Sequence, residues 1–95
     1  MKIRPTVMQF AEAMEKKLRQ HDEEKGGWED CDFPFLFDKL EEEHDEVTNI
    51  IEKDFKNNRF PGELVDLANV CMMIWDKIKH SGKYDTWKNG RPITS

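Results

Sequence analysis

The chain contains 95 residues and carries a formal net charge of −5, with 20 acidic against 15 basic residues. A chain of this length forms one domain, which we assign to residues 1–95. The acidic balance argues against nucleic acid as a partner, although a bound cation could still bring a nucleotide to the protein. Leu, Ile, Val and Phe make up only 21 residues. The core of one chain is therefore expected to be thin and to be supplemented by contacts between subunits.

The sequence has no segment typical of a membrane or secreted protein. Its longest apolar run, from Val70 to Trp75, has six residues, whereas a membrane-spanning helix needs roughly 20. No apolar stretch follows Lys2 and Arg4, so the N-terminus does not resemble a signal peptide. Cys31 and Cys71 form no Cys-x-x-Cys pair and cannot build a disulfide framework. We therefore expect two reduced thiols in a cytoplasmic protein without a membrane partner.

Helical spacing of apolar residues predicts a first helix over about residues 7–20. Thr6 and Gln9, directly after Pro5, form a capping box at its start. The polar run 21–25 and the paired glycines 26–27 are expected to end it. The apolar residues that define its buried face are Val7, Phe10, Ala11, Met14 and Leu18.

Two further helices follow. Asp32 as N-cap and Pro34 in the first turn predict the start of the second helix, which is expected to end near 57–58. Pro61 predicts the start of the third, which runs to about His80. The expected fold is all-α, a small bundle of about three main helices per chain, with its core over residues 7–80 and completed by homo-oligomerisation.

The tail from residue 83 to 95 shows no helical or strand period. Asn89-Gly90 lies in this polar segment without flanking β-branched runs, so we do not expect a hairpin there. The tail is predicted to be irregular, with packing on a partner chain as one use for its aromatic residues Tyr84 and Trp87.

One acidic residue of the second helix falls on its apolar face. On a helical wheel counted from Leu36, Glu43 lies at about −20°, in the middle of the apolar stripe. Glu46 and Lys39 lie along one border of that stripe, whereas Glu41 lies on the solvent side. Exposing Glu43 to solvent would also expose the apolar residues of this stripe, so Glu43 is not expected to be an ordinary surface charge. The stripe consists of Leu36, Leu40, Val47, Ile50 and Ile51.

The third helix repeats this conflict. Apolar residues cover nearly all of its circumference, yet Glu63 and Asp66 stand one turn apart at its start. Burying carboxylates is costly unless they are protonated, paired or bound to metal, and Lys39 is the only obvious basic partner. Clustered carboxylate oxygens suit hard cations such as Mg²⁺ or Mn²⁺. A purely structural network of acids, lysines and waters is the alternative.

The acids also follow a recognisable order. Residues 42–46 read Glu-Glu-x-x-Glu, and after a spacer of 16 residues, 63–66 read Glu-x-x-Asp. This two-part pattern resembles the signature of the MazG-like, all-α nucleoside triphosphate pyrophosphatases, over roughly residues 10–80. The segments Lys25-Gly26-Gly27-Trp28 and Phe35-Leu36-Phe37 are similar to a subgroup of short, often phage-encoded members.

The resemblance implies a helical bundle that hydrolyses a nucleoside triphosphate to the monophosphate and pyrophosphate with Mg²⁺. It implies that Glu43, Glu46, Glu63 and Asp66 are the metal ligands. Glu42 then acts from an outer position or orients a water. The resemblance also implies a homodimer or a dimer of dimers, with a site lined by more than one chain.

The chemistry of such a site leaves several roles open. Two or more Mg²⁺ ions neutralise phosphate charge and lower the pKa of a bound water. Either Glu46 or Glu42 could accept the proton of that water. Lys39 could contact phosphate or only balance the acids.

Three residues are candidates for binding the rest of the substrate. Trp28 could stack on a base or plug the end of the bundle. Asn69, next to Asp66 on the helix, could bind a sugar or a metal-bound water. Lys25 could meet a phosphate or remain an ordinary exposed lysine. The sequence does not identify the base, the sugar or the number of phosphates.

Two other functions compete with this interpretation. A di-iron carboxylate bundle uses Glu-x-x-His pairs, and Glu41 with His44 fits that spacing, although both lie away from the acidic edge. A helical interaction module without catalytic activity would also suit the acidic charge and the third helix rich in Met and Trp, but it does not explain four inward acids.

Overall fold

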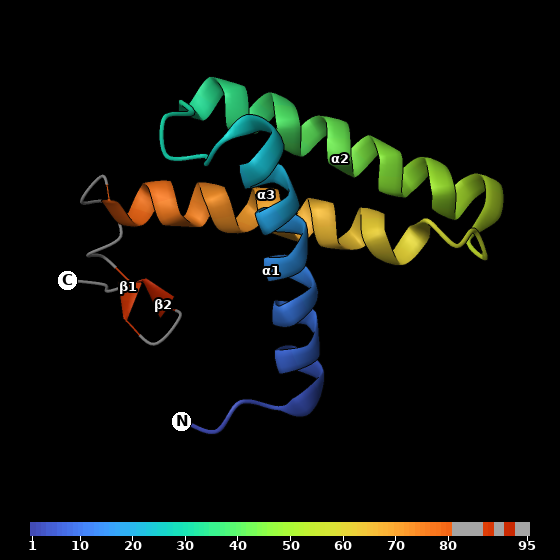
Figure 1. Cartoon of the computed structure of the whole chain (residues 1–95), viewed down its shortest axis with the longest axis horizontal. Helices are drawn as coiled ribbons and strands as arrows, with labels where there is room; N and C mark the ends of the chain where they lie inside the picture. Colours follow the sequence, from blue (N-terminus) through green and yellow to red (C-terminus); the bar gives the residue numbers. More distant parts are fainter. Residues whose placement is uncertain (81–86, 89–90, 93–95) are drawn as a thin grey trace.

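The computed structural model describes residues 1–80, 87–88 and 91–92. These residues form three long helices, α1 (Pro5–Lys25), α2 (Phe33–Asp54) and α3 (Phe60–His80), so the predicted all-α class is confirmed. Figure 1 shows α2 and α3 side by side and running in opposite directions, with α1 crossing them. The largest contact is between α2 and α3, and α1 packs mainly on α3.

The first helix is longer than predicted at both ends. Pro5 itself occupies the first turn after the N-cap Arg4, and no side chain caps this end. The predicted capping box of Thr6 and Gln9 is therefore wrong, because Thr6 already lies inside the helix. At the other end the polar run 21–25 stays helical, since its Glu and Lys residues are good helix formers. Gly26 ends the helix with φ of 78°, a left-handed conformation that suits glycine.

The other helices begin close to where the sequence predicts. Asp32 is the N-cap of α2, and its Oδ1 accepts a hydrogen bond from the backbone N–H of Phe35 at 3.0 Å. The helix ends at Asp54, a few residues before the predicted 57–58. Asn57 instead organises the turn before α3, because its Oδ1 accepts from the backbone N–H of Arg59 at 2.9 Å.

The tail differs from the expected irregular segment. Residues Trp87–Lys88 (β1) and Arg91–Pro92 (β2) pair as short antiparallel strands, with Trp87 opposite Pro92. The sequence between them is Asn89-Gly90, the dipeptide that favours two-residue hairpin loops. The expectation of an irregular tail is therefore wrong for residues 87–88 and 91–92, which pair as strands. The remaining expectations for the tail fall on 81–86, 89–90 and 93–95, outside the described residues.

The core of one chain is thin, as expected. Its buried apolar side chains are Leu18, Leu36, Val47, Val65 and Val70.

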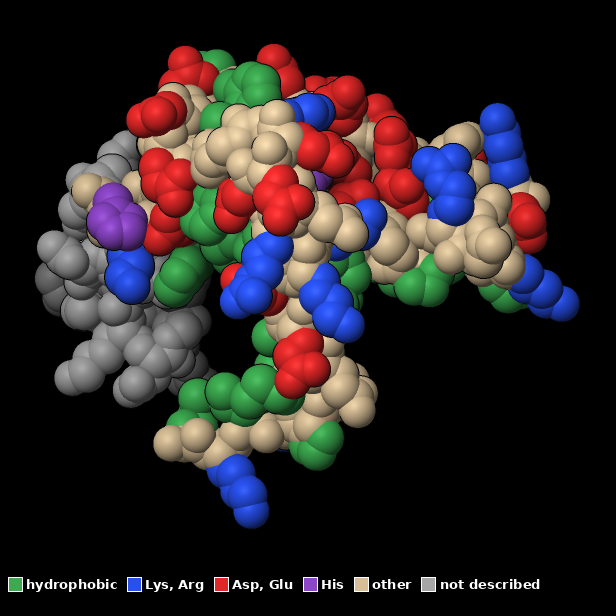
Figure 2. Space-filling view, in the orientation of Figure 1, with side chains coloured by type: hydrophobic (Ala, Val, Ile, Leu, Met, Phe, Trp, Pro, Cys, Tyr) green, Lys and Arg blue, Asp and Glu red, His purple; other side chains and the backbone are tan. Residues whose placement is uncertain are grey.

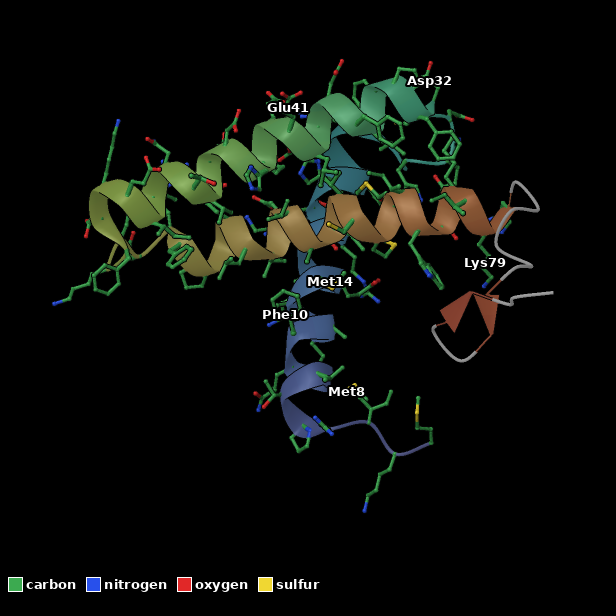
Figure 3. The ribbon with its side chains drawn as sticks, turned by 180° about the vertical axis from the view of Figure 1, so that it is seen from behind. Met8, Phe10, Met14, Asp32, Glu41 and Lys79 are labelled. Atoms are coloured by element: carbon green, nitrogen blue, oxygen red, sulfur yellow. The ribbon has the colours of Figure 1, made fainter. Side chains whose placement is uncertain are left out.

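Much of the predicted apolar surface remains uncovered. Val7 and Phe10 on α1 are 55% and 41% exposed, and Figure 3 shows Phe10 on the half of α1 that projects away from α2 and α3. Figure 2 shows apolar side chains gathered near this N-terminal end. Ile51 is also exposed, although the wheel placed it on the buried stripe, because it lies at the edge of that stripe. On α3, Leu64 is exposed, so this helix is not buried on all sides within one chain.

Across the described residues, no helix combines the length and the apolar composition that crossing a lipid bilayer requires.

Candidate active site

Three carboxylates converge where α2 packs on the first turns of α3. One oxygen each from Glu43, Glu63 and Asp66 lies within 4.8 Å of the others. Glu63 and Asp66 come from successive turns of α3, and Glu43 faces them because it lies within the apolar stripe of α2. Packing these two helices through their apolar faces therefore necessarily brings the acids together.

Two oxygens of this cluster have no hydrogen-bond donor. Glu43 Oε2 and Glu63 Oε2 are both buried and unpartnered, and the Glu63 side chain as a whole is almost completely buried. Burial raises the pKa of Glu43, and the neighbouring charges of Asp66 and Glu63 raise it further. Ionised carboxylates can only accept, so these oxygens require a proton or a cation. A small oxygen-seeking cation such as Mg²⁺ fits this donor set.

Glu46 lies at the exposed edge of the cluster, next to Glu63. A side-chain hydrogen bond between these two carboxyl groups raises the pKa of Glu46 to about 7, and burial adds to this. The same hydrogen bond lowers the pKa of Glu63, and Arg59 lowers it further. The proton therefore belongs to Glu46, which donates to the Glu63 carboxylate when protonated.

Two basic residues that the sequence analysis missed contact the cluster. The Arg59 guanidinium donates to Glu63 Oε1 at 3.0 Å, and Lys17 Nζ lies 3.6 Å from Asp66 Oδ1. The statement that Lys39 is the only obvious internal base is therefore wrong. Arg59 precedes Glu63 by four residues, a spacing that pairs charges on a helix and could have identified it. Lys17 comes from α1, and no local pattern connects it with Asp66.

The predicted residues Lys39 and Glu42 pair with each other at 3.7 Å, outside the cluster of three acids. Glu42 is 67% exposed, as expected for an outer position, and Lys39 is half-buried. Lys39 still partly offsets the rise in the pKa of Glu43. Glu41 and His44, the possible iron ligands, are exposed, and Figure 3 shows Glu41 pointing away from α3. The structure therefore brings neither of them to the cluster.

A pocket of about 330 Å³ opens beside the carboxylates. All three predicted substrate residues line it: Lys25 at the exposed end of α1, Trp28 in the following loop, and Asn69 on α3. The Trp28 indole Nε1 donates to Asp76 Oδ2 at 3.2 Å, so hydrogen bonding orients the ring. Asn69 is buried, and its Nδ2 donates to the backbone oxygen of Met14 at 3.2 Å. The pocket thus joins a carboxylate cluster to an aromatic wall.

The pKa shifts predict how the stability of the metal-free protein depends on pH. The raised pKa values of Glu43 and Glu46 mean that both bind protons more tightly in the folded chain, so their contribution to stability falls as pH rises above about 4.5. For Glu46, whose pKa is raised to about 7, this loss extends to about pH 7. The pKa of Glu63 is lowered instead, and the contribution of Glu63 to stability is lost only as pH falls below about 4.5. In EDTA we expect the melting temperature to decrease between pH 5 and 7.

The matched variants for this prediction are Glu46→Gln and Asp45→Asn. Glu46→Gln should flatten most of the decrease, whereas Asp45→Asn, on the exposed face of α2, should keep it. All other titratable groups are shared, so the difference between the profiles isolates Glu46. Equal profiles for Glu46→Gln and the parent would show that the Glu46–Glu63 contact does not hold the proton.

Comparison with known proteins leaves the family unassigned. No protein-family model matches the chain, and no solved structure matches it. The chain is similar to an uncharacterized protein of Archaeoglobus fulgidus, with 41% identity over 59 residues. The match covers 61% of this chain and 61% of that relative, so the chain spans less than two thirds of the relative's length.

Proposed function

We propose that the protein is a Mg²⁺-dependent nucleotide pyrophosphohydrolase that cleaves a (deoxy)nucleoside triphosphate to the monophosphate and pyrophosphate. The observation that carries this proposal is the cluster of Glu43, Glu63 and Asp66, with two buried oxygens lacking donors, at the edge of a partly aromatic pocket. The order of these acids along the chain resembles the two-part signature of the MazG-like enzymes, which supports the same reaction.

In this proposal Glu43, Glu63 and Asp66 hold the metal, with Glu46 as a further ligand at the edge and Mn²⁺ as a substitute ion. Bound Mg²⁺, as two or more ions, would neutralise phosphate charge and supply a water of lowered pKa. Lys17 and Arg59 contact Asp66 and Glu63, although neither of them lines the pocket. In this proposal they balance the charge of the acids in the metal-free protein.

Glu46 is a better candidate than Glu42 for accepting the proton of the attacking water. It lies beside the cluster, and its hydrogen bond with Glu63 raises its pKa to about 7, which suits a group that accepts a proton near neutral pH. Glu42 is 67% exposed and is paired with Lys39. Lys39 lines the pocket and is therefore close enough to serve either the substrate or the acids.

The reaction itself gives the most direct test. Incubation with each of the common NTPs and dNTPs in Mg²⁺ should convert at least one of them to the monophosphate and pyrophosphate, and EDTA should stop the reaction. Chromatographic separation of the products identifies the bond that is cleaved. Accumulation of a nucleoside diphosphate with orthophosphate would place the attack at another phosphorus and contradict the proposal.

We also propose that the working unit is a homodimer or a dimer of dimers. Among the described residues only five apolar side chains are buried, while Val7, Phe10 and Leu64 are exposed. Covering such apolar surface with a second copy would stabilise both chains. Light scattering at micromolar concentration should give at least twice the mass of one chain, and Phe10→Glu should shift the protein towards monomer. A stable, active monomer of the parent would contradict this assembly.

A further inference from the structure

In the side chain of Asn69, the amide nitrogen forms a hydrogen bond and the amide oxygen forms none. It is only 5% exposed, and its Nδ2 donates to the backbone oxygen of Met14 on α1. Figure 3 shows Met14 at the level where α1 crosses α3. A carbonyl oxygen can only accept, so this contact fixes which end of the amide faces α1. The other end, Asn69 Oδ1, is buried and has no donor.

The unpartnered oxygen is an unusual feature for a native protein, where buried acceptors are nearly always paired. Flipping the amide would not give Oδ1 a donor. It would turn Nδ2 away from the Met14 oxygen and so break the hydrogen bond between them. Asn69 lines the pocket beside the carboxylates, so a ligand in that pocket can supply the missing donor.

The position of Asn69 along α3 indicates which part of a nucleotide it meets. Asp66, Asn69 and Met73 follow one another at the pocket wall, and the rise of about 1.5 Å per residue places Asn69 between the other two. In the proposed function the phosphates lie at the Asp66 end. The aromatic ring of Trp28 and the side chain of Met73 offer an apolar surface for a base. The sugar connects phosphate and base, and so it lies opposite Asn69.

We propose that Asn69 Oδ1 accepts a hydrogen bond from a donor on the nucleoside part of the substrate, namely a hydroxyl of the sugar, and that the protein thereby selects substrates by their sugar. This inference rests on the proposed function for the position of the phosphates. Met14 contributes through its backbone, because its carbonyl oxygen holds the amide nitrogen of Asn69 and leaves Oδ1 as the acceptor without a donor. A substrate without the hydroxyl leaves Oδ1 buried and unpaired.

The test compares substrates that differ by one donor in the parent and in Asn69→Leu. For each base we compare NTP with dNTP for the 2′-hydroxyl and dNTP with ddNTP for the 3′-hydroxyl, and GTP with ITP for a base amino group. In the parent, losing the recognised hydroxyl should lower kcat/KM by about tenfold to a hundredfold. In Asn69→Leu the same ratio should be near one. A ratio of kcat/KM values within one variant does not depend on the fraction that folds, so partial unfolding cannot imitate the result.

Asn49→Leu is the matched control, because Asn49 is exposed on α2 and should keep the ratios of the parent. Ratios that are equal in the parent and in Asn69→Leu for every pair overturn the inference. A change confined to the GTP and ITP pair assigns the donor to the base and overturns the sugar assignment. Calorimetric titration with AMP, dAMP and ddAMP applies the same comparison to binding. If no nucleotide is hydrolysed, the proposed function fails, while the ratios of Kd still decide the role of Asn69.

Discussion

Replacing Asp66 by Asn or Glu43 by Gln is expected to reduce nucleotide hydrolysis by at least about a hundredfold. Changing groups that only support a metal ligand typically costs 10–100-fold, so losing a ligand should cost at least about as much. Both residues offer an oxygen to the same small space. Steady-state rates of monophosphate formation at saturating Mg²⁺ measure the effect, with circular dichroism to show that the helices remain.

The matched control is Glu41→Gln. Glu41 precedes Glu43 by two residues on the same helix but lies on the exposed face, as Figure 3 shows. This variant should keep nearly full activity. Glu43→Gln should also leave the metal-free protein at least as stable as the parent, because burial and the charges of Asp66 and Glu63 disfavour its ionised form. If Glu41→Gln and Glu43→Gln lost activity equally, the assignment of the inner and outer faces of α2 would be wrong.

Adding Mg²⁺ or Mn²⁺ to the EDTA-treated protein is expected to raise its melting temperature by about 10 °C or more. An ion that binds the folded chain alone stabilises it by about 2.7 kcal/mol at a hundredfold excess over Kd. For a domain of this size, each 1 kcal/mol corresponds to roughly 4–8 °C. The physical source is relief of repulsion within the cluster and coordination of its two unpartnered oxygens. Differential scanning fluorimetry across a series of metal concentrations measures the shift, with NaCl at equal ionic strength as the reference.

Two variants should move this shift in opposite directions. Asp66→Asn should remove most of it, because a ligand is lost. Lys17→Met keeps the apolar stem of the side chain but removes the ammonium group beside Asp66. The metal ion then no longer competes with this ammonium group for the Asp66 carboxylate. We therefore expect the shift in Lys17→Met to begin at a lower Mg²⁺ concentration. A parent protein whose melting temperature is insensitive to both ions would exclude the cluster as a metal site.

The exposed apolar half of α1 explains why the helical pattern alone overstated the core of one chain. Val7 and Phe10 repeat at the spacing of a buried face, and that spacing correctly predicted a helix. The same spacing cannot say which molecule covers the face. Within the described residues, burial on α1 is confined to its middle, between Ala13 and Leu18, where α3 packs on it.

The ends of the helices show where local rules suffice. At Asp32 and at Pro61 the signals act within one turn, since a cap or a fixed φ depends only on neighbouring residues. The end of α1 was placed too early because the polar run 21–25 lacks an apolar period. Intrinsic propensity kept this run helical until Gly26, whose positive φ stops it.

The amino-acid sequence by itself determined three helices and the inward position of Glu43, Glu63 and Asp66, because the period of a helix decides which side chains share a face. Only the tertiary structure decided which groups from other helices meet them. Lys17 reaches Asp66, and Asn69 reaches the Met14 backbone, only because α1 crosses α3 at that level. Such contacts join residues about 50 positions apart, and they depend on how whole helices pack rather than on any spacing along one of them.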